Sequence, residues 1–112
     1  MTAAKYDINI DQGSDFEISI VIEEDGAVKN LTGYGARAQM REHTEATTAH
    51  DFDTTGSSFD SSGTVKIAMA HTVTDDIPAG IYFYDLEIFH TVNDTVTRIL
   101  QGKATVSREV TR

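Results

Sequence analysis

The segment Ile77–Phe89, with the sequence IPAGIYFYDLEIF, holds the chain's one proline and a regular alternation of side chains. From Ile81 onward this period of two predicts a β-strand over residues 81–89. Pro78 fixes its own φ and favours an extended residue before it, whereas Gly80 can adopt a positive φ that other residues resist. We therefore expect a tight crossover that restarts as a central strand.

The first tyrosine of this strand, Tyr82, lies two residues after Gly80. In immunoglobulin-like folds, a tyrosine in this place donates a hydrogen bond back to the preceding crossover, an arrangement called the tyrosine corner. We expect Tyr82 to lock the crossover in this way. The period of two gives the strand an inward face of Tyr82, Tyr84, Leu86 and Ile88 and an outward face of Phe83, Asp85 and Glu87. The outward face is either solvated or in contact with another subunit.

The same alternation recurs on both sides of this segment. It predicts further strands over residues 5–10, 16–23, 34–41, 64–70 and 96–107, with short edge strands near 50–54 and 57–60. Asp25-Gly26 and Asn93-Asp94 have the residue types of hairpin turns. Residues 71–80 predict one helical turn, which Thr74 or Asp75 is able to cap, or an ordered crossover.

The alternation also assigns residues to the core. In the first strand it places Tyr6, Ile8 and Ile10 inward. In the last strand an unbroken period places Val96, Arg98, Leu100, Gly102, Ala104 and Val106 on one face. The glycine within this last strand, Gly102, indicates a bulge or a bend.

About seven to eight short antiparallel strands, with no helix longer than a turn, predict an all-β, immunoglobulin-like β-sandwich. We expect residues 1–112 to form a single domain, because a chain of this length can bury one core and no linker divides it. Residues 43–63 are polar and small, and predict a variable loop. Residues 108–112 predict a short, solvated C-terminal tail.

The charge balance argues against nucleic-acid binding. The net charge is −9, from 18 acidic and 9 basic residues, and the basic residues are spread along the sequence rather than clustered. No apolar run approaches the roughly 20 residues of a membrane span, and the N-terminus has no signal-peptide pattern. We therefore expect neither nucleic acid nor membrane as a partner.

Patterns that carry chemistry are weak in this chain. The stretch DFDTTG, residues 51–56, is similar to the start of a calcium loop, but Ser62 stands where the bidentate glutamate belongs. The four histidines are not at helical i, i+4 spacing, and there is no cysteine. Serine-nucleophile and phosphate-loop motifs are also missing. We expect no enzyme activity, no cofactor and no metal; a glycan or weak calcium site in the 43–63 loop stays an open alternative.

Four stretches carry a family resemblance: YDINIDQGSDFEISIVI (6–22), GAVKNLTGYGARAQMR (26–41), IPAGIYFYDLEI (77–88) and VTRILQGKATVSREVTR (96–112). Their order resembles small structural proteins of tailed phages and prophages. It is also similar to the N-terminal immunoglobulin-like domain of phage baseplate upper proteins. The resemblance implies a virion component, made in the host cytoplasm, that belongs to a tail, baseplate, neck or capsid decoration. It implies other virion subunits as partners, in multiple copies of a symmetric assembly, and no catalytic residues.

Aromatic side chains are the first candidates for such subunit contacts. The sequence suggests five of them: Phe52, Phe59, Phe83, Tyr84 and Phe89. A second hypothesis is a carbohydrate- or receptor-binding module, because sandwich folds often hold such sites in their end loops. That hypothesis needs Tyr6 or Tyr34 as a binding platform, and the absence of tryptophan weakens it.

Overall fold

Strands make up most of the computed structural model, which describes residues 3–111. The largest sheet has the order β1-β10-β9-β6-β7, and β2 also pairs with β10. Its strands are β1 (Ala4–Lys5), β2 (Ile8–Asp11), β6 (Tyr34–Arg41), β7 (His50–Asp51), β9 (Gly80–His90) and β10 (Val96–Ser107). We call this the main sheet. The long central strand β9 is the one predicted from the segment Ile77–Phe89.

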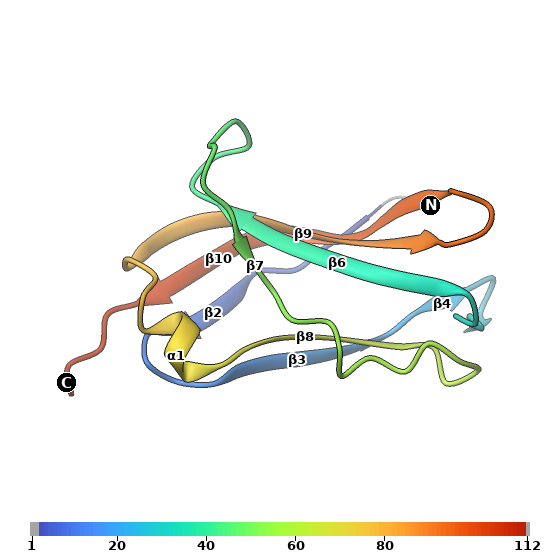
Figure 1. Cartoon of the computed structure of the whole chain (residues 1–112), viewed down its shortest axis with the longest axis horizontal. Helices are drawn as coiled ribbons and strands as arrows, with labels where there is room; N and C mark the ends of the chain where they lie inside the picture. The colour runs from blue at the N-terminus through green and yellow to red at the C-terminus, as the bar shows by residue number, and fades with distance from the viewer. Residues whose placement is uncertain (1–2, 112) are drawn as a thin grey trace.

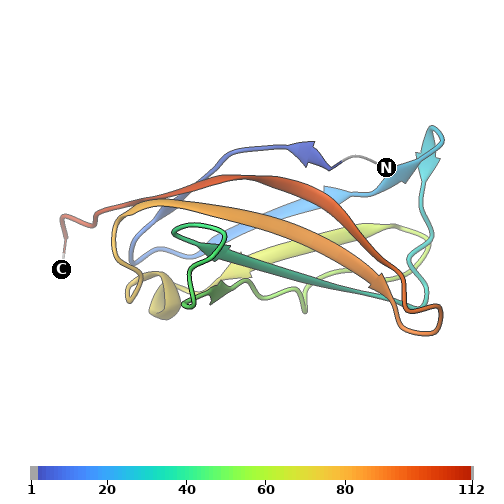
Figure 2. The same cartoon turned by 90° about the horizontal axis from the view of Figure 1, so that it is seen from above.

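A second layer of strands lies against one face of the main sheet (Figures 1 and 2). It consists of β3 (Phe16–Val21) and β8 (Thr64–Met69), which pair antiparallel. The short hairpin of β4 (Glu23–Glu24) and β5 (Ala27–Val28) continues from β3 and projects at the end of the molecule opposite the one-turn helix α1 (His71–Thr74). The described residues therefore form an all-β structure of several sheets.

The core lies between the two layers and follows the predicted alternation. Val65, Ile67 and Met69 of β8 are buried, as the period of two requires. Opposite them, β9 buries its predicted inward face of Tyr82, Tyr84, Leu86 and Ile88. Burial of this apolar area, at about 25 cal/mol per Å², is the main favourable term holding the layers together.

The crossover before β9 is built as predicted. The Tyr82 hydroxyl donates a hydrogen bond of 2.7 Å to the Pro78 carbonyl, which is the tyrosine corner. Gly80 has a φ of 153°, in the region where other residues are strained. The segment thus turns the chain from the second layer into the main sheet and fixes it there.

Of the two residues predicted to cap the helical turn, Asp75 is its C-cap and Thr74 lies inside the turn. The N-cap is Ala70, which makes no side-chain cap bond. Asp15 from the β2–β3 loop caps the turn instead, because its Oδ1 accepts a 2.7 Å bond from the His71 amide. The Thr74 hydroxyl is buried, donates to the Ser14 carbonyl and accepts from the Gly13 amide. It therefore ties α1 to the same loop.

The predicted first strand is divided in two, and its direction differs from the expectation. Both β1 and β2 pair parallel with β10, so the strands are not all antiparallel. Between them the chain passes close to Gly102, where a Cβ atom would lie 2.2 Å from the Tyr6 carbonyl oxygen. The Tyr6 side chain is 54% exposed rather than inward, while Ile8 and Ile10 are buried as expected.

The last strand also departs from the predicted period. The register of β10 against β9 shifts between Arg98 and Leu100, so the bulge lies there and not at Gly102. Arg98 pairs with Glu87 on the outward side of the sheet, whereas Leu100 pairs with Leu86 in the core. The glycine instead allows the close backbone approach just described.

The segment 43–63 contains little regular structure. β7 covers part of the edge strand predicted at 50–54, and an isolated bridge joins Asp53 to Ala68. The strand predicted at 57–60 is reduced to a bridge between Ser58 and Thr64. These bridges bring the segment alongside β8.

Among the described residues, no helix has the length and apolar character needed to cross a bilayer.

Candidate protein-contact surface

The main sheet has a second face, directed away from the core, that we call the outer face. The strand register places its side chains in rows across the sheet. One row runs Arg37, Glu87, Arg98 and the next runs Gln39, Asp85, Gln101, Lys5. The third row is Arg41, Phe83, Lys103. Segments far apart in the sequence therefore meet on one surface.

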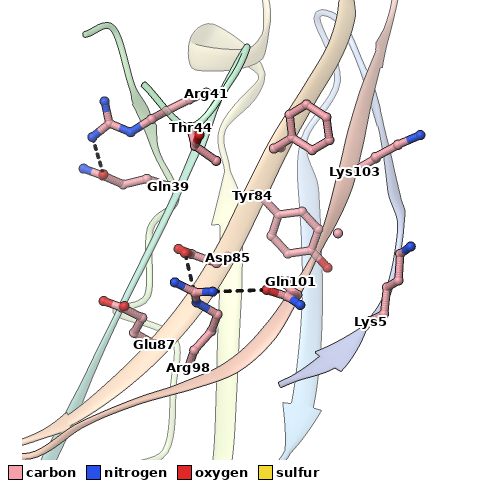
Figure 3. Close-up of a pocket in the computed structure, with 12 residues that line it drawn as sticks. Lys5, Gln39, Arg41, Thr44, Tyr84, Asp85, Glu87, Arg98, Gln101 and Lys103 are labelled. Atoms are coloured by element: carbon pink, nitrogen blue, oxygen red, sulfur yellow. Dashed lines mark hydrogen bonds and ion pairs between the residues drawn. The ribbon is translucent and has the colours of Figure 1, made fainter. Parts of the chain in front are cut away.

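The outer face is hollowed around the middle of β9 (Figure 3). The hollow has a volume of about 610 Å³, which lies within the roughly 300–1,000 Å³ of typical binding sites. Side chains from β1, β6, β9 and β10 line it, together with Thr44 from the loop between β6 and β7. Phe83 is the exposed apolar side chain in this lining, at 45%.

Two ion pairs lie on the outer face. The Arg37 Nε atom is 2.9 Å from Glu87 Oε1, and the Arg98 Nε atom is 3.4 Å from Asp85 Oδ2. Arg98 also donates to the Gln101 side chain at 3.2 Å, as Figure 3 shows. Partial burial, with the neighbouring Glu87 charge, raises the pKa of Asp85, and the surrounding arginines oppose this rise.

Three other cations of the outer face, unlike Arg37 and Arg98, are not in ion pairs among the described residues. Within residues 3–111, no carboxylate lies within 4.0 Å of the side-chain nitrogens of Lys5, Arg41 or Lys103. Arg41 instead donates to the Ala46 carbonyl at 2.6 Å and to the Gln39 side chain at 3.2 Å. The row around Phe83 therefore combines an exposed ring with two cations that have no carboxylate partner.

The fold gathers basic residues that the sequence shows as dispersed. The outer face carries five of the nine cations of the chain. Its carboxylates are Asp85, Glu87, Asp11 at the end of β2 and, on the edge strand β7, Asp51, with Asp7 at the adjoining β1–β2 junction. Cations and carboxylates are thus equal in number here, five to five, against four to thirteen over the rest of the chain. The expectation that the basic residues do not cluster is wrong for this face.

The five aromatic candidates lie in different environments. Phe83 is exposed in the hollow, and Phe89 is half-buried on the same outer face with the Arg37 guanidinium 5.3 Å from its ring centre. Phe59 is half-buried against the core. Phe52 and Tyr84 are 6% and 4% exposed, so these two rings fill the core and are not available as surface contacts.

Tyr84 is held in place by more than packing. Its hydroxyl donates a hydrogen bond to the Tyr6 carbonyl, which joins β9 to the β1–β2 junction across β10. Burial of the phenol raises its pKa to about 12, with smaller contributions from Asp7 and Tyr6. A buried phenol with a satisfied hydroxyl is a structural group.

The residues of the calcium-like stretch are occupied by other contacts. Asp51 Oδ1 accepts a 2.6 Å bond from Gln39, and Asp53 Oδ1 accepts bonds from the Thr55 amide and hydroxyl. These bonds lower the pKa of Asp53. In the part of the chain that the structure describes, no three His, Cys, Asp or Glu side chains gather in a way that could hold a metal ion.

The two tyrosines of the carbohydrate hypothesis are not brought together. Tyr6 lies at the β1–β2 junction, and Tyr34 begins β6, where its ring packs edge-on against His90 at a centroid distance of 4.8 Å. Neither ring lines the hollow of the outer face.

Sequence reasoning identified Phe83, Asp85 and Glu87 as outward but missed the basic residues around them. The alternation of Arg37, Gln39 and Arg41 with the small or apolar residues between them was a usable signal of one polar strand face. The register between strands, which sets these side chains beside β9, was not available from that alternation.

Neither a protein-family model nor a curated protein matches the chain.

Proposed function

We propose that this chain is a non-enzymatic structural module of a tailed-phage virion, built as an immunoglobulin-like β-sandwich, and that it acts through subunit contacts. The observation that carries the proposal is the outer face, which combines an open hollow, an exposed phenylalanine and cations without carboxylate partners. An exposed apolar group rimmed by polar side chains is typical of a protein contact surface.

The strand arrangement supports the fold part of the proposal. In this proposal the order β10-β9-β6 is assigned to the G, F and C strands of an immunoglobulin-like domain, and the pair β3-β8 to its B and E strands. The tyrosine corner lies between β8 and β9, as it does between the E and F strands of that fold. The resemblance of four sequence stretches to phage structural proteins supports the assignment to a virion.

Purified particles test this function. Phage particles from a host strain that carries this gene should contain the protein in several copies per particle, measured by quantitative mass spectrometry against the major capsid protein. A tagged chain expressed from a plasmid should enter particles and be excluded by excess untagged chain. If purified infectious particles lack the protein, the proposed function is wrong.

A further inference from the structure

We propose that the outer face is a docking site for a second copy of this chain, and that the occupant is the acidic tip of its β4–β5 hairpin. This inference rests on the proposed function, because it names the contact by which copies of the module join. The outer face has as many cations as carboxylates, whereas the rest of the chain is strongly acidic, and three of its cations have no carboxylate within 4.0 Å among the described residues.

The hairpin tip carries carboxylates that could pair with the cations of the hollow. Glu23, Glu24 and Asp25 follow one another at the tip, and all three are exposed. Of these carboxylates, only Glu24 has a cation within 4.0 Å among the described residues, at 3.2 Å from Lys29 Nζ. A tip with two carboxylates without such a partner complements a face where Lys5, Arg41 and Lys103 have none.

Apolar contacts match as well as charges. Val21 at the end of β3 and Val28 in the hairpin strand β5 are 54% and 46% exposed. They offer branched aliphatic surface next to the carboxylates, just as Phe83 offers a ring next to Arg41 and Lys103. Docking would remove the two valines and Phe83 from water. This burial adds a favourable contribution to the free energy of association that is not screened by salt.

The shape of the molecule makes this acidic segment accessible. The hairpin projects at one end of the molecule (Figures 1 and 2), and it turns tightly through Asp25 and Gly26, both at positive φ. Asp51 and Asp53 are already bound to neighbouring side chains. A projecting turn can enter an open hollow.

The contact is heterologous, because the tip and the hollow are different surfaces of the chain. Two hollows placed against each other would bring Lys5, Arg41 and Lys103 of both copies together, which disfavours a two-fold dimer at this site. Heterologous contacts build closed rings or open filaments. Both are arrangements in which one small module is present in many copies.

Sedimentation velocity of the full chain tests the inference, with two double variants of exposed residues. K5E/K103E lowers the net charge from −9 to −13 and reverses the hollow. E23K/E24K raises it to −5 and reverses the tip. K66E/R108E is the control, because it also gives −13 and changes no residue named in either surface; it also removes the Lys66–Glu17 ion pair. Far-ultraviolet circular dichroism establishes that each variant is folded.

We expect the unmodified chain to self-associate at about 0.03 M salt and to dissociate toward about 1 M. Each surface variant alone should associate at least about tenfold more weakly, because like charges then meet. An equimolar mixture of the two surface variants should regain association, since the reversed tip fits the reversed hollow and the unmodified pair remains. The control should behave as the unmodified chain does.

Three results would overturn the inference. These are a chain that stays monomeric at every concentration, association that the tip variant leaves unchanged, and surface variants whose mixture does not recover. If the outer face instead binds only a different purified virion subunit, self-docking is wrong while the proposed function stands. Absence from purified particles refutes the proposed function, and the sedimentation results do not depend on it.

Discussion

Replacing Tyr82 by phenylalanine removes the hydroxyl of the tyrosine corner and leaves the ring in place. The hydroxyl donates a 2.7 Å bond to the Pro78 carbonyl, and the side chain is buried. A typical neutral hydrogen bond contributes about 0.5–1.5 kcal/mol, and an acceptor left unsatisfied adds to the loss. We therefore expect the free energy of unfolding to fall by about 1–2 kcal/mol, and Tm to fall by roughly 4–8 °C.

Urea denaturation followed by circular dichroism measures the difference, with thermal melting as a second readout. Tyr6→Phe is the matched control, because the Tyr6 ring is exposed and its hydroxyl makes no hydrogen bond within residues 3–111. The control should stay within about 0.5 kcal/mol of the unmodified chain. If Tyr82→Phe melts together with the control, the hydroxyl does not hold the crossover and the reasoning about the corner is wrong.

Three further changes test the β1–β2 junction and the core. The pKa of Tyr84 is about 12 when folded and near 10 when unfolded. Its contribution to the free energy of unfolding is therefore present below pH 10 and should be lost as pH rises toward 12. Tyr84→Phe should flatten this loss of stability in denaturation curves recorded from pH 9 to 12. Gly102→Ala should lower stability by about 1–3 kcal/mol in urea titrations, because its Cβ would meet the Tyr6 carbonyl oxygen at 2.2 Å. A loss below 0.5 kcal/mol, which fits a flexible β1–β2 junction, would contradict that expectation. Ile67→Ala, in the fully buried part of β8, should cost about 2–5 kcal/mol, and an unchanged urea midpoint would show that this residue is not in the core.

Local patterns in the sequence were sufficient for most of the individual strands. The period of two in Ile81–Phe89 predicted β9 and its buried face, because alternation along a strand is decided by neighbours in the chain. The same holds for β3, β6 and β8. The tyrosine corner was also predictable, since Pro78, Gly80 and Tyr82 lie within five residues of one another.

Pairings between distant segments were not predictable in this way. The parallel pairing of β1 and β2 with β10 joins residues about 95 positions apart, and an amphipathic strand has the same alternation in either direction. The outer face was missed for the same reason. Arg37, Glu87 and Arg98 form one row only because β6, β9 and β10 are in that register.

The bulge in β10 shows how the core and the outer face depend on one another. An unbroken strand that buries Leu100 also directs Arg98 into the core, where an unpaired cation costs several kcal/mol. The additional residue, Ile99, is buried beside Leu100 and resets the alternation. Arg98 can then face outward and reach Asp85, while Leu100, Ala104 and Val106 stay inside. One inserted residue thus allows a single strand to supply both the apolar core and part of the surface that we propose as the docking site.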